Sequence, residues 1–291
     1  MPPQPAARLW PDPATIQERF RGVFFARWEE LLRLRRAVMK TSDLDDIHDL
    51  RVASRQFRAA LELFDPFASK EQKRELRKNV RRLTRILGGL RNIDEALLFF
   101  RSPPRTDIPA SKELCRILSK LRSRNLKLIK KALSAFDHRK LDRMVRELVA
   151  GLNEDCIAGR NGISSPAYLS GVSIRRYLPI CQLLAVATAP AHRASRHALR
   201  IAIKKWRYFL EIVSSILDRD YTPVLETLKG YQSILGRMND IAEFEVLLSN
   251  LDVSPEVREY TEATLQMEDA LLLNNLTGLI ERKPLAYTFL I

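Results

Sequence analysis

The sequence predicts an all-α fold built from two copies of a four-helix unit, related by an internal duplication, with a charged surface and channel to which both copies contribute. The chain has only ten glycines among its 291 residues. Between its few breaker segments, apolar residues recur every three or four positions, as they do on one face of a helix, and alternating strand patterns are nearly absent. The third observation is a charged segment that begins at His48 and recurs from His197.

Nine helices are expected, because the segments between breakers are rich in Leu, Arg, Ala, Glu and Lys, which favour helix. Breakers gather at residues 101–109, which contain three prolines, and at residues 159–171, which are rich in glycine and serine. The expected helices cover residues 13–40, 43–64, 69–101, 111–135, 137–157, 172–189, 191–217, 220–250 and 254–281.

Two pairs of segments indicate a tandem duplication of a four-helix unit. Residues 48–62 align without a gap with residues 197–211, and residues 86–93 align with residues 234–241 at almost the same offset. The expected organisation is an N-terminal tail over 1–14, a first helical half over 15–158, a connecting loop over 159–171, a second helical half over 172–282 and a C-terminal tail over 283–291.

Charged side chains line one face of the expected helix over residues 43–64. At about 100° per residue, Arg51, Arg55 and Arg58 fall on the same side as His48, opposite an apolar stripe. Glu62 ends the charged stripe, one turn beyond Arg58, where it can pair with that arginine.

The second copy keeps this stripe in register while neighbouring positions change. Its members are His197, Arg200, Lys204, Arg207, Tyr208 and Glu211, with Lys205 beside them, and Arg176 in this copy corresponds to Arg27 in the first. A face that is merely solvated, the alternative interpretation, would drift between copies. The retained pattern therefore favours a functional surface.

Arginines in this spacing suit an elongated anion. The guanidinium group is a planar fork that matches phosphate oxygens, and the stripe from His48 to Arg58 spreads its donors over roughly 15 Å. A bound polyanion would favour the protonated histidine, so affinity is expected to rise as pH falls; the alternative is that the histidine only packs at the helix start.

The expected helix over residues 69–101 carries the strongest basic run in the chain. Its counterpart in the second copy offers only Lys229 and Arg237 nearby, so the two halves are unequal and the first is expected to dominate the charged surface. The run consists of Arg74, Arg77, Lys78, Arg81, Arg82 and Arg85.

Composition points to an anionic partner and argues against several other classes. The formal net charge is +14, from 49 Lys and Arg against 35 Asp and Glu. Cys115, Cys156 and Cys181 have neither disulfide-framework nor zinc-site spacing, which fits a reducing cytoplasm. With no secretory signal, membrane-length apolar run, HExxH, ExExK or GxxxxGK[ST] motif, we expect a cytoplasmic protein that is not an enzyme and has no metal or cofactor.

Two histidine-arginine motifs carry a family resemblance. The pattern His48-x-x-Arg51-x-x-x-Arg55-x-x-Arg58, its counterpart starting at His197, and the Leu-Gly-x-Leu/Met-x-Asn/Asp segments resemble the CHAD family, named for conserved histidines and α-helical content. The resemblance covers about residues 15–250. It implies paired four-helix bundles around a basic pore or groove that binds inorganic polyphosphate, and association with a triphosphate-tunnel phosphatase or with polyphosphate granules. In the second copy, Ala242 and Ser233 stand where the first has Asp94 and Arg85.

The expected function is non-catalytic polyphosphate binding through these Arg, Lys and His residues. Sequence-nonspecific binding of nucleic-acid backbones is the main alternative, because charge alone would support it. Stacking with bases is not favoured, since Phe57, Phe64 and Trp206 fall on the buried side of their helices. A granule-associated structural or adaptor protein is the third possibility, in which the amphipathic helix over 254–281 serves a partner.

Overall fold

The computed structural model describes residues 10–63, 70–151 and 165–289, and within them the fold is all-α, as predicted, with no strand. Within these described ranges, nine α-helices and one short 3₁₀ helix form a compact domain. They are α1 (Pro13–Lys40), α2 (Leu44–Leu63), α3 (Lys70–Arg101), η2 (Arg105–Asp107), α4 (Pro109–Ser134), α5 (His138–Ala150), α7 (Ser165–Ala187), α8 (Arg193–Leu217), α9 (Thr222–Ser249) and α10 (Pro255–Arg282).

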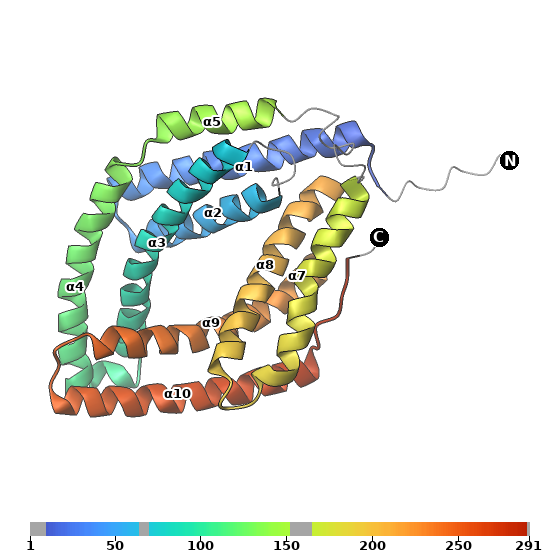
Figure 1. The fold of residues 1–291 in the computed structure, drawn as a ribbon. Coiled ribbons are helices and arrows are strands. Elements are labelled where there is room, and N and C mark those ends of the chain that lie inside the picture. The colour runs from blue at the N-terminus through green and yellow to red at the C-terminus, as the bar shows by residue number, and fades with distance from the viewer. Residues whose placement is uncertain (1–9, 64–69, 152–164, 290–291) are drawn as a thin grey trace.

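The long helices form the sides of a frame (Figure 1). In this view α1 and α5 lie along the top, α4 on the left, α10 along the bottom and α7 with α8 on the right. Neighbours in the chain pack in pairs, α1 with α2, α3 with α4, α7 with α8 and α9 with α10. The first five helices meet the last four through α1–α8, α2–α8, α3–α9 and α4–α10 contacts, so the charged faces of α2 and α8 are brought together.

Local capping explains several helix boundaries. Asp12 caps α1, because its carboxylate accepts a hydrogen bond from the Thr15 amide at 3.0 Å, and Pro13 fits the first helical position. Ser254 and Pro255 start α10 in the same way. At the other end of a helix, Asp218 adopts a left-handed φ of 55° and terminates α8. These starts and stops agree with the helices expected from the sequence to within two residues.

One predicted boundary is wrong. The helix expected to begin at residue 172 begins at Ser165, so residues 165–171 of the expected connecting loop belong to α7. Pro166 lies in the first helical turn, where no backbone N–H bond is lost, and the serine-rich sequence is compatible with a helix start. At the end of the first half, α5 stops at Ala150, and the predicted continuation to residue 157 lies outside the described residues.

The core is formed by the apolar stripes that the sequence predicts. Phe57 of α2 and Trp206 of α8 are both fully buried, Phe57 against Trp28 and Trp206 against Phe209. Phe64, predicted to join this side, lies outside the described residues. Burial of both aromatic anchors fixes which faces of α2 and α8 point away from the core, and the charged stripes lie there.

The segment after α10 is packed onto the second half of the molecule. Tyr177 and Tyr231 donate hydrogen bonds to the carbonyls of Leu285 and Lys283, both at 2.8 Å. Tyr287 stacks on Trp206 with ring centroids 5.9 Å apart, and Phe289 is 1 % exposed. The expected C-terminal tail therefore contributes to the core through residue 289.

Replacing Phe289 by alanine is expected to lower the free energy of unfolding by about 3 kcal/mol, the lower end for removing a buried aromatic ring. The ring contacts Phe209, Tyr221 and Trp10, so its loss opens a cavity between the tail and α8. Urea denaturation measures the change, and Tyr287→Phe, which keeps the ring, is the control. A loss below about 1 kcal/mol would show that the tail adds little to the core.

Candidate anion-binding site

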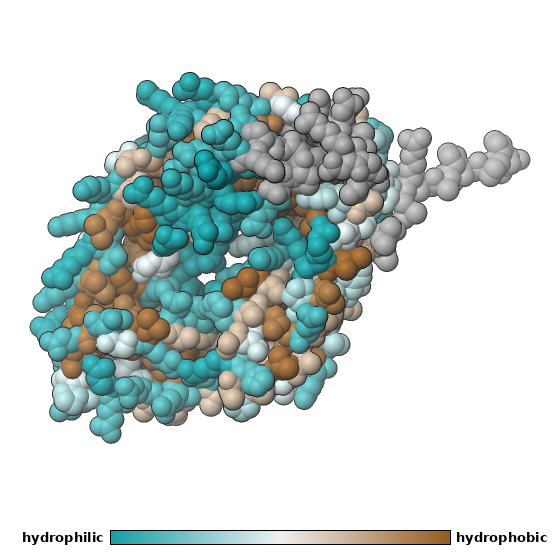
Figure 2. Space-filling model, viewed as in Figure 1, coloured by the Kyte–Doolittle hydropathy of each residue, from teal (hydrophilic) through white to brown (hydrophobic). Residues whose placement is uncertain are grey.

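An open cleft of about 480 Å³ lies where α2, α3, α8 and α9 meet. Six arginines from α2, α3 and α8 line it, against a single carboxylate, that of Glu243. Figure 2 shows hydrophilic side chains gathered over α2 and α3 beside a hollow in the molecule. The lining residues are Arg51, Arg55, Arg58, Arg81, Thr84, Arg85, Gly88, Gly89, Asn92, His197, Arg200, Ile201, Asn239 and Glu243.

Two of these arginines are almost completely buried. Arg51 is 8 % exposed and Arg200 is 6 % exposed, because α2 and α8 pack against each other along their charged faces. The Nε atoms of Arg51, Arg58 and Arg200 are buried and have no hydrogen-bond partner in the part of the chain that the structure describes. The cleft thus holds buried cationic side chains whose Nε donors are not satisfied from within the described chain.

Burial and mutual repulsion act on the arginines of α2 and α8 that line the cleft. Burial, followed by the charges of Arg55, Arg91 and Arg200, lowers the pKa of Arg51 to about 9. Burial, followed by the charges of Arg55 and Arg91, lowers the pKa of Arg200 to about 10. Burial also lowers the pKa values of Arg55 and Arg58. Arg51 and Arg200 still carry their charge at neutral pH, so the cleft is strongly positive.

Lys204 lies one helical turn beyond Arg200 and behaves differently. It is half-buried, and burial together with the charges of Arg200, Arg55, Arg51 and Arg91 lowers its pKa to about 6. A lysine amine with this pKa is largely uncharged at neutral pH. Tyr208, one turn further along α8, is hydrogen-bonded to Arg55.

A polar clasp that the sequence reasoning did not assign to the site joins α3 to α9. Arg91 donates two hydrogen bonds to the carboxylate of Asp240 and forms an ion pair with Glu95 at 3.3 Å. Asn92 donates to Glu243 at 2.7 Å. Burial acts to lower the pKa of Arg91, but the hydrogen bonds and charge of Asp240 outweigh it and raise that pKa. The repeated segments 86–93 and 234–241 pointed to these positions, but not to the contact between them.

The two predicted histidines occupy different surroundings. His197 lines the cleft, and its Nδ1 is hydrogen-bonded to Asn239 Oδ1 at 2.8 Å. His48 is exposed near the start of α2 and does not line the cleft. Only the second-copy histidine therefore joins the arginine cluster.

The remaining predicted residues lie around the cleft or away from it. Arg27 donates to Gln56 at 2.7 Å, and Arg176 donates to the Lys205 carbonyl at 2.9 Å and lies 3.7 Å from Glu62. Arg207 is held by Glu211, as predicted for this pair, at 2.7 Å. The exposed predicted residues outside the lining are Arg74, Arg77, Lys78 and Arg82 of α3, Lys205 of α8 and Lys229 of α9, whose Nζ lies 4.0 Å from Glu226.

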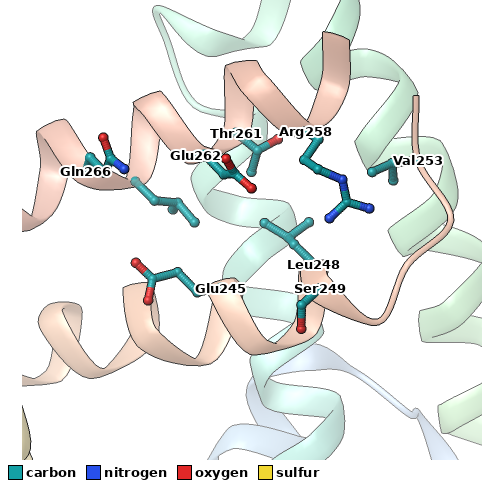
Figure 3. Close-up of a pocket in the computed structure, with 9 residues that line it drawn as sticks. Glu245, Leu248, Ser249, Val253, Arg258, Thr261, Glu262 and Gln266 are labelled. Carbon is teal, nitrogen blue, oxygen red and sulfur yellow. The ribbon is translucent and has the colours of Figure 1, made fainter. Parts of the chain in front are cut away.

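A second hollow, between α9 and α10, lacks this charge pattern (Figure 3). Its volume is about 240 Å³, and side chains of both signs surround it, Glu245 and Glu262 with Arg258 beside them. Leu248 and Val253 contribute apolar surface. A hollow with two carboxylates and one guanidinium does not favour a polyanion.

Basic residues also cover the outer face of α4, on the side opposite the face that packs on α3. They are exposed, and none of them lines the cleft. In Figure 1, α4 lies at the edge of the frame. These residues are Lys112, Arg116, Lys120, Arg124, Lys127 and Lys131. They supply matched controls for tests of the cleft, because they carry the same charge outside it.

The described residues contain no group of His, Cys, Asp and Glu side chains suited to a metal ion. None of the described helices is both long enough and apolar enough to cross a membrane. Of the cysteines, Cys115 is buried and Cys181 is exposed, and both are free thiols.

Comparison with known proteins gives one family. The CHAD domain family matches residues 23–249. No curated protein matches the chain. Several solved chains match it, and two of them illustrate the shared fold. The crystal structure of the CHAD domain from the plant Ricinus communis has a TM-score of 0.68 at 24 % identity, over 94 % of this chain and 93 % of that one. PptA from Streptomyces chartreusis has a TM-score of 0.64 at 17 % identity, over 91 % of this chain and 99 % of that one. Because the family match spans most of its length, the chain belongs to the CHAD family.

Proposed function

We propose that the protein binds inorganic polyphosphate in the arginine-lined cleft and does not transform it. The observation that carries this proposal is the pair Arg51 and Arg200, buried with Nε donors that no acceptor in the described chain satisfies. Burying an unpaired charge is costly, and a bound anion offsets that cost by supplying acceptors and opposite charge. Strong charge-assisted hydrogen bonds to phosphate oxygens are the contacts that arginine forms best.

The spread of the donors favours a chain of phosphates over a single one. Arg51, Arg55 and Arg58 extend over about 10 Å of α2, and Arg81 and Arg85 of α3 lie in the same lining. A lone phosphate has too few oxygens to satisfy donors so far apart. A linear polyanion can contact them in succession.

The proposal includes the internal duplication that the sequence predicts. The two halves are copies of one four-helix unit, and α2 and α8 are equivalent helices whose charged faces line a shared central groove. The contact between α2 and α8, and cleft residues from both, support this view. The greater number of arginines from α2 and α3 supports a site dominated by the first half.

Nucleic-acid backbone is the second candidate, favoured by the net charge of +14. The aromatic residues on α2 and α8 argue against nucleic-acid binding. Phe57 and Trp206 are fully buried, so neither offers a stacking surface to a base. Inorganic polyphosphate needs no such surface.

Titration with long-chain polyphosphate, triphosphate and duplex DNA, at matched phosphate concentration and at two salt concentrations, tests the proposal. We expect the tightest binding for long-chain polyphosphate, a large gain over triphosphate, and weakening of all three by salt because the contacts are ionic. Calorimetry measures the affinities.

The control is a variant with Lys120, Arg124 and Lys127 of α4 changed to alanine, which lowers the net charge without touching the cleft lining. Its affinity for polyphosphate should stay within about threefold of wild type, since screened charges far from the ligand contribute little. DNA binding equal to or tighter than polyphosphate binding would overturn the proposal.

The family resemblance extends the proposal to binding partners and to cellular location. We propose a cytoplasmic protein, at polyphosphate granules, that acts with a triphosphate-tunnel phosphatase or with granule proteins. A structural or adaptor role at granules would follow from the same binding. Co-localisation of the tagged protein with stained polyphosphate, lost when the cleft arginines are removed, would support this extension.

A further inference from the structure

Two adjacent glycines, Gly88 and Gly89, lie in the interior of α3 and line the arginine cleft. A glycine inside a helix makes the helix less stable than an alanine would, because the glycine backbone loses more conformational freedom on folding. Two glycines in succession therefore need a structural or functional reason.

Neither the backbone nor the packing of α3 requires these glycines. Their φ angles lie outside the left-handed region, and a methyl group placed on either residue meets no atom of another described helix within 4 Å. Elsewhere the space is tighter, since a methyl group on Gly171 or Gly278 would meet an arginine side chain at 3.2 or 3.0 Å. Side chains at Gly88 and Gly89 would fill open space beside the cleft.

The packing of α2 on α3 shows which part of the cleft faces the glycines. The hydroxyl groups of Ser54 and Thr84 are hydrogen-bonded at 3.0 Å. The two helices are consecutive and closely joined in the chain, so they pack antiparallel. Gly88, one turn after Thr84, is therefore level with Arg51, which lies one turn before Ser54.

Arg51 is the buried side chain that needs an acceptor here. It is 8 % exposed, it lines the same cleft, and its Nε has no hydrogen-bond partner within the described residues. Arg85, one turn before Gly89, belongs to the same wall of the cleft. An anion that extends from Arg85 to Arg51 therefore passes over the two glycines.

A glycine of the same kind occurs in the second half of the chain. Gly236 of α9 aligns with Gly88, and a methyl group on it also meets no atom of another described helix within 4 Å. It lies three residues before Asn239, which lines the cleft, so it shares that face of α9. A glycine that packing does not require thus recurs on the cleft side of both helices.

We propose that Gly88 and Gly89 form a bare floor of the cleft, on which the bound phosphate chain lies against the backbone of α3. The inference rests on the proposed function, since it needs an extended anion in this cleft. The absence of side chains leaves the width that the chain occupies while its oxygens accept hydrogen bonds from Arg51. The ligand, and not the fold, requires glycine at these two positions.

Replacing both Gly88 and Gly89 by alanine is expected to move stability and affinity in opposite directions. The variant should unfold at a higher urea concentration than wild type, because alanine favours helix and its methyl group has space. Its affinity for long-chain polyphosphate should fall by about tenfold or more, because two methyl groups occupy the path of the ligand. Calorimetry in a phosphate-free buffer measures the affinity, and urea unfolding measures the stability.

Gly22→Ala on α1 is the matched control. Gly22 is exposed inside a long helix, and a methyl group on it also meets no atom of another described helix within 4 Å, but it does not line the cleft. It should raise the stability without changing the affinity for polyphosphate. Gly89→Leu, which places a larger side chain on the floor, should weaken binding further than Gly89→Ala.

The outcomes separate this inference from the proposed function. Tight polyphosphate binding by wild type that survives the change of both glycines to alanine would overturn the glycine floor and leave the proposed function standing. A double variant that loses stability together with affinity would also overturn it, because the fold would then require the glycines. Failure of wild type to bind polyphosphate would overturn both.

Discussion

Replacing Arg51 and Arg200 together by alanine is expected to weaken polyphosphate binding by about 3–6 kcal/mol, since each charge-assisted hydrogen bond contributes roughly 1.5–3 kcal/mol. Both side chains line the cleft and have buried donors without partners in the described chain. Their removal breaks no ion pair within the described residues and relieves repulsion within the cluster, so the domain should remain folded. Calorimetry measures the affinity, and thermal unfolding measures the stability.

A double variant on α4, Arg116→Ala with Arg124→Ala, is the control for this experiment. It removes the same charge from an exposed helix face outside the cleft lining. Its affinity should remain close to that of wild type. If the Arg51 and Arg200 variant bound as tightly as wild type, the anion would have to bind elsewhere, and the exposed arginines at the start of α3 would be the next to test.

Replacing Asp240 by alanine is expected to lower the free energy of unfolding by about 3–5 kcal/mol, the usual cost of removing one partner of a buried ion pair. Asp240 is 5 % exposed and accepts two hydrogen bonds from Arg91. Without it, Arg91 keeps only its ion pair with Glu95, close to the buried cations Arg51 and Arg200. Of the clasp between α3 and α9, only the hydrogen bond from Asn92 to Glu243 remains. Urea denaturation gives the loss directly.

The matched control for the clasp is Arg91→Met combined with Asp240→Leu. Removal of both charges in favour of apolar side chains of similar volume is expected to restore most of the lost stability, because neither member of the buried Arg91–Asp240 pair is then left as an unpaired charge. A single Asp240→Ala variant as stable as wild type would contradict the prediction, because it would show that Asp240 is not needed to offset the charge of Arg91. A double variant as unstable as the single would show that the volume, not the charge, matters.

Helix positions could be predicted from local sequence because their causes are local. The Asp12-Pro13 and Ser254-Pro255 starts combine a capping side chain with a proline that suits the first turn. The start of α7 was missed because the same residue types, in Ser165-Pro166 and the neighbouring glycines, also occur in loops. The composition of such a short segment does not distinguish a helix start from a loop.

The sequence predicted only part of the cleft, because helical spacing fixes the residues on one helix face but not which helix faces meet. Helical spacing placed Arg51, Arg55 and Arg58 on one face, and the recurrence in the second half placed Arg200 likewise. Spacing does not say which faces meet. His48 belongs to the predicted stripe yet lies outside the cleft, whereas Arg91 and Asp240 lie at its edge through a contact between α3 and α9.

The sequence by itself determined the all-α fold, nearly all helix boundaries and the basic stripes, since capping, helical periodicity and charge depend on residues near one another in the chain. Only the tertiary structure decided that the stripes of α2 and α8 pack together, because contacts between distant helices depend on how the whole core closes. That packing buries Arg51 and Arg200 and leaves Lys204 among arginines with the lowest pKa of the cluster. The contact between α3 and α9 holds Asp240 against Arg91. Burial converts a charged surface pattern into a site, since desolvation makes each unpaired charge costly until an anion offsets it.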